Sequence, residues 1–143
     1  MADASLEELI VQFRDAASAF ARGDPEPVKA LYANTEDVVL ANPFGPAVRG
    51  WDQVSAALER AASSFRDGRV IEFERVAEYG DGDLMTIHER EQWEARVGDG
   101  AQVTGFELRV TTTFRRTAGE WRIVHRHADP IATADDAGPL RAS

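Results

Sequence analysis

Cysteine is absent from all 143 residues of the sequence, which excludes disulfide bonds, thiolate metal ligands and a cysteine nucleophile. Long apolar runs are absent too. A helix needs about 20 predominantly apolar residues to cross a bilayer, so we expect no membrane partner. The first residues are acidic and lack the basic and then apolar pattern of a secretion signal, and we therefore predict a cytoplasmic protein.

Basic residues are outnumbered by acidic ones. The sequence has 16 Lys and Arg against 25 Asp and Glu, which gives a formal net charge of −9 at pH 7. Contacts with phosphates require clustered cations, so we expect no nucleic-acid partner.

The chain has the length of a single domain, which we place at residues 1–132. Residues 133–143 are small, polar or acidic without periodicity, and we predict that they form a disordered tail.

Apolar residues at helical spacing predict three helices in the first half of the chain. Ser5 is the expected N-cap of the first helix, and Gly23 ends it. Asp24 caps the second helix and Pro25 takes its first position. Residues 42–46, Asn-Pro-Phe-Gly-Pro, predict a turn. The expected elements are helices over residues 5–22, 25–33 and 51–65 and short strands over residues 37–41 and 47–49.

The second half of the chain predicts strands only. Gly-containing joints typical of hairpins separate four segments, which are residues 69–79, 84–97, 103–117 and 120–129. Helices followed by a four-stranded antiparallel meander give an α+β layout. Two of these strands span about 14 residues, which is long for a small flat sheet. We therefore expect a strongly curved sheet that wraps around the helices.

The last predicted strand carries the pattern on which the predicted site depends. Successive strand residues point to opposite faces, so one face carries Trp121, Ile123, His125, His127 and Asp129. Pairing with strand 103–117 adds apolar residues to this face and sets Thr112 opposite His125. The opposite face carries Arg109, Arg115, Arg122 and Arg126, and burying it would strand charges. We therefore predict that His125 and His127 point inward, a placement that a β-bulge would reverse.

Two neighbouring strands add charged residues to the same predicted interior. In strand 84–97, the apolar face includes Trp93 together with Glu89 and Glu91. In strand 69–79, it includes Arg75. Charged side chains are rarely buried without a partner. The sequence therefore predicts a pocket in which polar groups lie among apolar walls, with Asp129 near its rim.

Three segments resemble the nuclear-transport-factor-2-like superfamily, and most closely its SnoaL-like and ketosteroid-isomerase-like branch. They are Arg22-Gly23-Asp24 through Leu31-Tyr32-Ala33, Asn42-Pro43-Phe44-Gly45 with Arg49-Gly50, and Arg115-Arg116 through Trp121 to His127. The last segment also resembles the association domain of calcium/calmodulin-dependent kinases. The resemblance covers roughly residues 5–130 and implies an α+β cone that pairs as a homodimer. It does not imply one activity, because such cones serve isomerases, dehydratases, cyclases, hydrolases and non-catalytic assembly domains.

Three positions depart from what the resemblance implies. Asn42 stands where the isomerases carry the aspartate that abstracts a proton, and an amide cannot act as that base. Ala16 falls at about the position of their oxyanion-hole tyrosine and has no hydroxyl to donate. The pocket arginine of the kinase association domain falls at Thr112 in the predicted register. We therefore expect no steroid isomerisation by the mechanism of that family.

The candidate catalytic residues are His125, His127, Glu89 and Glu91. Histidine titrates near neutral pH and burial raises the pKa of a carboxyl group, so a histidine and a glutamate together are suited to proton transfer. The alternatives are two histidines whose hydrogen bonds are satisfied within the fold, and a glutamate neutralised by Arg75.

The candidate ligand-binding residues are Asn42, Phe44, Arg75, Trp93, Thr112 and Asp129. Asn42 either orients a ligand carbonyl or bonds its own backbone in the turn. His125, His127 and Asp129 alternate on one strand, but their spacing matches no recognised metal signature. We therefore expect neither a metal nor another cofactor.

Together these features predict a protein that binds a hydrophobic, oxygenated small molecule. If it is an enzyme, the expected chemistry is isomerisation, dehydration, cyclisation or hydrolysis by acid–base groups without a cofactor. The alternative is a non-catalytic ligand-sensing or oligomerisation module, which Asn42 and Ala16 favour. A metal-dependent hydrolase is a third hypothesis, and elemental analysis for zinc, iron and manganese tests it.

Overall fold

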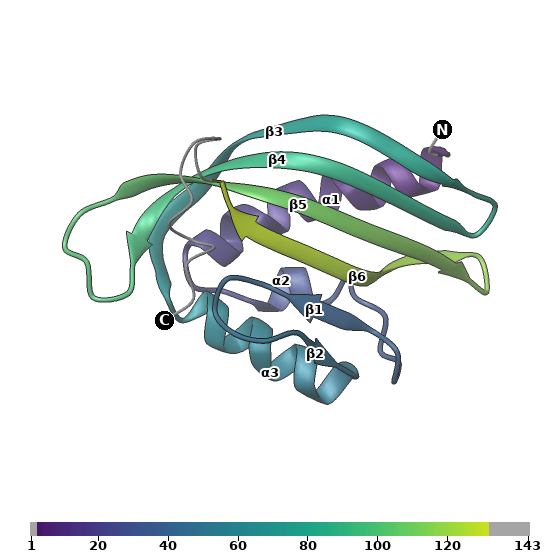
Figure 1. Cartoon of the computed structure of the whole chain (residues 1–143), viewed down its shortest axis with the longest axis horizontal. Helices are drawn as coiled ribbons and strands as arrows, with labels where there is room; N and C mark the ends of the chain where they lie inside the picture. The colour runs from purple at the N-terminus through teal and green to yellow at the C-terminus, as the bar shows by residue number, and fades with distance from the viewer. Residues whose placement is uncertain (1–2, 132–143) are drawn as a thin grey trace, which may run out of the picture.

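The computed structural model describes residues 3–131, so the tail predicted at residues 133–143 lies outside the described residues. Within that range, six strands form a single strongly curved sheet, and three helices lie beneath it (Figure 1). The elements are α1 (Ala4–Ala21), α2 (Glu26–Lys29), β1 (Val39–Ala41), β2 (Val48–Arg49), α3 (Trp51–Ala62), β3 (Phe65–Asp81), β4 (Leu84–Val97), β5 (Thr104–Thr117) and β6 (Glu120–Pro130). The predicted α+β cone is confirmed.

The sheet has the strand order β2-β1-β6-β5-β4-β3. Its four long strands form the antiparallel meander that the hairpin joints predict. The short strand β1 runs parallel to β6, with Leu40 opposite Arg126 and Ala41 opposite His127. β2 pairs antiparallel with β1 at the edge. The two short strands therefore join the sheet and bring the turn after Ala41 beside the second half of β6.

Two helix boundaries differ from the prediction for local reasons. α1 begins directly after Asp3, because the carboxylate of Asp3, and not Ser5, accepts the backbone N–H of Leu6 at 2.9 Å. α3 ends at Ala62 because Phe65, expected to be its last residue, begins β3 instead. No helix within residues 3–131 is both long and apolar enough to span a bilayer.

The second helix is shorter than predicted because β6 holds the residues that follow it. α2 ends at Lys29, whereas the sequence predicts helix to about Ala33. The Ala33 N–H donates to the carbonyl of Ile123 at 2.8 Å, and the Ile123 N–H donates to the carbonyl of Leu31 at 2.9 Å. These bonds form an isolated parallel bridge that places Tyr32 beside Ile123.

The hydrophobic core lies between the concave face of the sheet and the helices. α1 runs along the concave side of β3 and β4, and α3 lies beside β1 and β2 (Figure 1). The stripe predicted on α1 is buried, with Leu6, Leu9, Ile10, Phe13, Ala17 and Phe20 all in the core. Burial of such side chains is the main favourable contribution to folding, and it fixes which face of each long strand points inward.

A β-bulge interrupts the pairing of β5 with β6. Before the bulge, Phe114 pairs with Ile123, as the sequence predicts. After it, Thr113 pairs with His125, so that Val124 has no partner of its own on β5. A bulge of this kind inserts one extra residue into one strand of an antiparallel pair. All residues of β6 after Val124 are therefore displaced by one position from the predicted register.

This displacement exchanges the two faces of β6 over its second half. Thr112 lies opposite Arg126 rather than opposite His125. Arg126 is consequently buried, His125 is half-buried and His127 is exposed. The predicted inward orientation of His125 and His127 is wrong, and so is the predicted outward orientation of Arg126.

Candidate functional site

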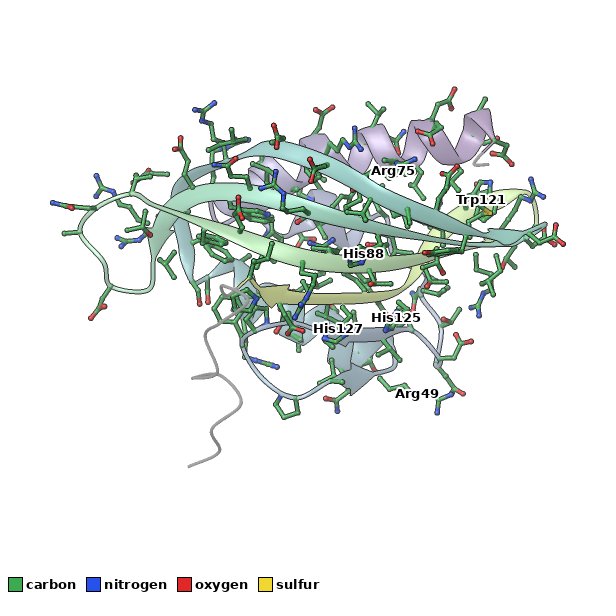
Figure 2. The ribbon with its side chains drawn as sticks, turned by 45° about the horizontal axis from the view of Figure 1, so that its top comes forward. Arg49, Arg75, His88, Trp121, His125 and His127 are labelled. Carbon is green, nitrogen blue, oxygen red and sulfur yellow. The ribbon has the colours of Figure 1, made fainter. Side chains whose placement is uncertain are left out.

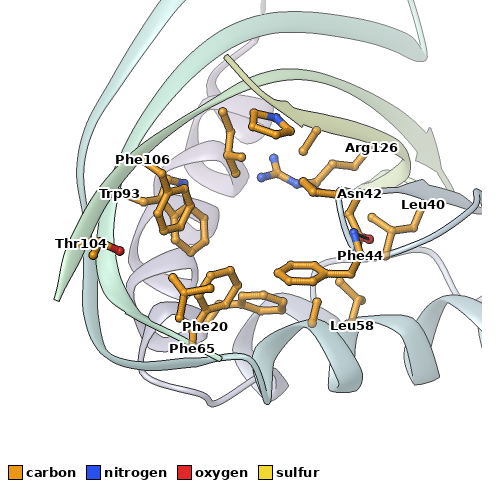
Figure 3. Close-up of a pocket in the computed structure, with 16 residues that line it drawn as sticks. Phe20, Leu40, Asn42, Phe44, Leu58, Phe65, Trp93, Thr104, Phe106 and Arg126 are labelled. Carbon is orange, nitrogen blue, oxygen red and sulfur yellow. Dashed lines mark hydrogen bonds between the residues drawn. The ribbon is translucent and has the colours of Figure 1, made fainter. Parts of the chain in front are cut away.

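A cavity of about 350 Å³ lies between the concave face of the sheet and helices α1 and α3 (Figure 3). Strands β4, β5 and β6 form one wall, the helices form the floor, and the turn after β1 forms the opposite wall. Most of the lining is apolar, and five aromatic side chains contribute to it, namely Phe20, Phe44, Phe65, Trp93 and Phe106. This volume and lining are typical of sites for small molecules.

The aromatic side chains form a continuous surface rather than scattered contacts. The rings of Phe65 and Phe106 stack with centroids 5.7 Å apart, and those of Trp93 and Phe106 stack at 5.8 Å. Phe44, from the turn after β1, meets Phe65 edge-on at 5.6 Å. Phe20 of α1 meets Trp93 edge-on at 6.4 Å. Flat apolar molecules fit against such a surface because offset and edge-on ring contacts are both favourable.

One charged side chain reaches into this apolar space. The guanidinium of Arg126 extends from β6 toward the aromatic side chains (Figure 3). Its Nη1 donates to Oε2 of Glu91 at 3.1 Å, and its Nη2 donates to Oε1 at 2.9 Å. Oε1 also accepts the indole N–H of Trp93 at 3.0 Å. The guanidinium carbon lies 4.8 Å from the ring centroid of Phe13, which adds a cation–π contact.

The surroundings of Arg126 keep it charged although it is buried. Burial opposes the charged form, but the attraction of the Glu91 carboxylate and its hydrogen bonds outweigh that effect and raise the pKa of Arg126. The pair therefore brings a positive and a negative charge together in the interior. Within residues 3–131, Arg126 is the only charged residue that lines the main cavity.

The second predicted carboxylate, Glu89, is buried at a different place. Its Oε2 accepts a hydrogen bond from Nη2 of Arg14 in α1 at 3.1 Å and another from Nε of Arg75 in β3 at 3.2 Å. Arg75 in turn bonds Glu7 of α1 at 3.1 Å. Glu89 and Arg75 therefore join α1 to the sheet, and neither lines the cavity. The alternative in which Arg75 neutralises a glutamate is confirmed.

The predicted histidine site lies on the outer face of the sheet. His125 and His127 are grouped there with His88, away from Arg75 (Figure 2). His127 Nε2 lies 2.8 Å from Oδ2 of Asp129, and their side chains are 52% and 43% exposed. Burial, and then the charge of His127, lower the pKa of His125. These residues do not line the cavity, so the predicted placement of Asp129 at its rim is wrong as well.

Three of the predicted ligand-binding residues do line the cavity: Asn42, Phe44 and Trp93. The Oδ1 atom of Asn42 accepts the backbone N–H of Phe44 at 3.0 Å, so Asn42 also bonds its own turn. The alternative in which Asn42 bonds its own turn is therefore confirmed, and its contact with a ligand stays a prediction. Thr112 is buried opposite Arg126 but is not part of the lining.

No group of three or more His, Asp or Glu side chains within residues 3–131 is arranged to hold a metal ion.

The sequence reasoning missed several residues that the fold brings to the cavity. The sequence places Phe20 and Phe65 on the buried faces of predicted helices and Phe106 on the apolar face of a predicted strand, without assigning them to a pocket, and it places Arg126 outside. Their aromatic character was visible, but their convergence depends on contacts between segments far apart in the chain.

These features define a class of protein. A strongly curved six-stranded sheet packed against three helices, with an apolar cavity between them, is the architecture of the nuclear-transport-factor-2-like cone. Residues 10–133, which are most of the chain, match the model of the SnoaL-like domain. The protein therefore belongs to the SnoaL-like family. No curated protein matches the chain in sequence.

Solved structures of this architecture agree with that assignment. A nuclear transport factor 2-like superfamily protein from Salmonella enterica is 19% identical, with a TM-score of 0.74 and 92% of each chain covered. A ketosteroid isomerase-like protein from Erwinia carotovora atroseptica is 21% identical, with a TM-score of 0.73 over 91% of this chain and 96% of that one. A candidate dehydratase of the same fold family from Streptomyces avermitilis is 19% identical, with a TM-score of 0.71 over 90% and 95%. Identities this low establish the fold and leave the activity open.

Proposed function

We propose that this protein binds a hydrophobic, ring-containing small molecule in the cavity beneath the sheet. The observation that carries the proposal is the surface of five aromatic side chains that encloses a space of about 350 Å³. Aromatic and aliphatic linings with few polar groups are typical of sites for such ligands. The cavity is bordered by exposed residues, Phe44, Val97 and Thr104 among them, which give a ligand access from solvent.

Ligand binding has better support than acid–base catalysis. Both oxygens of Glu91 already accept hydrogen bonds from Arg126 or Trp93, so neither is free to take a proton from a substrate. Glu89 is held by two arginines away from the cavity. His125 and His127 lie on the other face of the sheet. Catalytic roles for these four residues remain predictions without a geometric basis in this cavity.

The polar groups at the cavity suit a ligand with few hydrogen-bonding atoms. Asn42, Thr104 and Arg126 are the polar members of the described lining. Since the Oδ1 of Asn42 is used within its turn, its amide N–H groups remain for a ligand. We therefore propose that Asn42, Phe44 and Trp93 contact the ligand, with Asn42 orienting an oxygen atom and the two aromatic residues packing on its rings.

Direct binding to a neutral aromatic probe tests the proposal. N-phenylnaphthylamine fluoresces strongly in apolar surroundings, and we expect saturable binding of one molecule per chain. Ala128→Trp fills the cavity from β6 and is expected to abolish binding, whereas His127→Trp adds the same ring to the outer face and is expected to preserve it. Thr104→Trp, at an exposed part of the lining, is a second blocking variant that avoids strain in the core.

Thermal unfolding gives an independent measurement. A ligand at about 100 times its dissociation constant stabilises the folded chain by about 2.7 kcal/mol. Equal binding to the wild-type chain and to both folded blocking variants would locate the probe elsewhere and contradict the proposal.

We also propose that two copies of the chain pair through the outer face of the sheet. This face presents threonine hydroxyls of β4 and β5, with those of Thr86 and Thr113 2.9 Å apart and His88 bonded to Thr111 at 3.3 Å. Hydroxyl groups, which carry no formal charge, suit a protein interface, since the core of such interfaces is depleted in charged residues. Light scattering is expected to give the mass of a dimer. A monomer contradicts this proposal, and a larger ring favours the alternative of an oligomerisation module.

A further inference from the structure

A second cavity of about 40 Å³ lies next to the main one. The two cavities share Phe20, Leu58, Trp93 and Arg126 in their linings. Tyr32 lines only the smaller cavity. Arg126 therefore borders both spaces, and we treat the smaller cavity as the inner end of the region that the proposed ligand occupies.

Tyr32 lines this inner end and carries an unused polar group. It is 4% exposed, and its hydroxyl has no hydrogen-bond partner among the described residues. Buried hydroxyl groups in folded proteins are normally paired, so an unpaired one calls for an explanation. The backbone bridge to Ile123 fixes the position of Tyr32, and its ring lies 6.4 Å from that of Trp51. Burial raises the pKa of Tyr32 to about 12, so the hydroxyl keeps its proton at neutral pH and can donate it in a hydrogen bond.

We propose that Tyr32 and Arg126 form an inner subsite that binds the carbonyl oxygen of a neutral aromatic ketone. This inference rests on the proposed function, because it concerns the inner end of the same cavity. The rings of the ligand lie against the aromatic side chains of the main cavity, and its carbonyl group points past Arg126 toward Tyr32. The Tyr32 hydroxyl and an N–H of Arg126 both donate to the carbonyl oxygen.

The hydrogen-bonding capacity of the two residues matches a carbonyl oxygen. Two N–H groups of Arg126 donate to Glu91, and no acceptor within residues 3–131 bonds its remaining ones. Arginine has no acceptor, and the phenolic hydroxyl donates one hydrogen bond. A carbonyl oxygen accepts two hydrogen bonds and donates none, so it satisfies both groups at once.

The charges favour a neutral ligand over a carboxylate. Glu91 already balances the charge of Arg126 with two hydrogen bonds. A ligand carboxylate at the subsite would place a second negative charge near Glu91 in a space shielded from water, where like charges repel strongly. A ketone brings the acceptor without that charge.

A single water molecule is the alternative occupant of the small cavity. Its volume is sufficient for one water, but buried waters usually make about three hydrogen bonds. Tyr32 and Arg126 are the only polar residues in the described lining of this cavity. If a water molecule occupied this cavity, the Tyr32 hydroxyl would not contribute to ligand recognition, and its removal would not change the preference for a ketone.

Two ligands of matched shape test the subsite on the full-length chain. Acetylnaphthalene carries a ketone, and ethylnaphthalene substituted at the same ring carbon replaces it with an apolar group of similar size. Titration calorimetry gives the affinity ratio of the two ligands for each protein. Tyr32→Phe removes only the hydroxyl, and we expect it to lower the preference for the ketone about tenfold, since a buried hydrogen bond contributes that much. Tyr79→Phe, at a tyrosine that is 65% exposed, is the matched control and should leave the ratio unchanged.

The outcomes separate the subsite from the proposed function. If Tyr32→Phe leaves the ratio unchanged while both ligands still bind, the subsite is wrong and the proposed function stands. If naphthoate binds the wild-type chain more tightly than acetylnaphthalene, the preference for a neutral ligand is overturned. If neither naphthalene derivative nor N-phenylnaphthylamine binds the wild-type chain, the proposed function fails and the subsite with it. Thermal unfolding verifies that each variant is folded.

Discussion

The two faces of β6 beyond its bulge each carry a contact between a basic and an acidic side chain, in opposite surroundings. On the inner face, the Arg126 and Glu91 side chains are 9% and 1% exposed and meet through two hydrogen bonds. On the outer face, the His127 and Asp129 side chains are 52% and 43% exposed and meet at 2.8 Å. Water screens the outer pair and leaves the inner pair almost unscreened.

This difference shows why contact geometry alone does not identify a functional residue. Pairs on a protein surface contribute about 0–1 kcal/mol, because solvation competes with the attraction between the charges. A buried pair gains little net stability as a whole, yet each member depends strongly on the other. Arg126 is therefore held in one orientation at the cavity, whereas the contact of His127 with Asp129 is open to water.

The largest expected effect comes from breaking the inner pair. Arg126→Leu leaves the Glu91 carboxylate buried without its counter-charge, and we expect a loss of about 3–5 kcal/mol in the free energy of unfolding. His127→Leu on the outer face should change it by less than about 1 kcal/mol. Urea unfolding followed by circular dichroism measures both. Losses of equal size on the two faces would contradict the contrast between them.

A double-mutant cycle sharpens the same comparison. Glu91→Met combined with Arg126→Met removes both charges, so the double variant should be more stable than the sum of the single losses predicts. We expect a coupling of about 2–3 kcal/mol, less than full recovery because Trp93 loses its acceptor. The corresponding cycle of His127→Ala and Asp129→Ala should give a coupling of less than about 1 kcal/mol. Additive losses in the inner cycle would show that the pair does not act as a unit.

The fold could be predicted because local signals and hydrophobic pattern agree along the chain. Alternating apolar residues gave the bounds of β4 correctly, and the predicted hairpin joints match the turns that precede β5 and β6. The left-handed backbone at Gly98 and Gly119 shows why glycine occupies those joints. Such signals require only neighbours in sequence. The same pattern placed Glu89, Glu91 and Trp93 on the inner face of β4.

The site could be predicted only in part because it depends on long-range geometry. Val124 is β-branched like an ordinary strand residue, and nothing in its sequence neighbourhood marks a bulge. One unpaired residue was enough to reverse the roles of Arg126 and the histidines. Likewise, Glu89 and Glu91 share a face of β4, but their partners come from α1 and β6, which lie far from them in the chain.

The free energy of unfolding at high pH tests the burial of Tyr32 on the inner side of the sheet. The pKa of Tyr32 is raised from 10.0 to about 12 by burial, so its stabilising contribution is complete below pH 10 and is lost as the pH rises toward 12. The unfolded chain loses the tyrosine proton first, and the free energy of unfolding therefore falls over this interval, by about 2–3 kcal/mol.

Tyr32→Phe should remove most of this decline. The test is well isolated because Lys29 is the single lysine of the sequence and Tyr79 the single other tyrosine. Urea unfolding at several pH values between about 9 and 12 measures it, with Tyr79→Phe as control. Identical declines in wild type and Tyr32→Phe would mean that Tyr32 is not desolvated in the folded chain.

The smallest expected effect comes from His125 on the outer face. It is a loss of stability as the pH falls, whereas Tyr32 gives a loss as the pH rises. Its pKa is lowered by partial burial and then by His127, so its contribution to stability is present above pH 6.5 and is lost as the pH falls through the lowered value. Relative to His125→Asn, the wild-type chain should therefore lose stability only below about pH 6.5. Replacing His127 with Asn should weaken this dependence, because one cause of the lowered pKa is removed. Urea unfolding between about pH 7.5 and pH 5 decides the matter, since a pH-independent difference would place His125 in full contact with water.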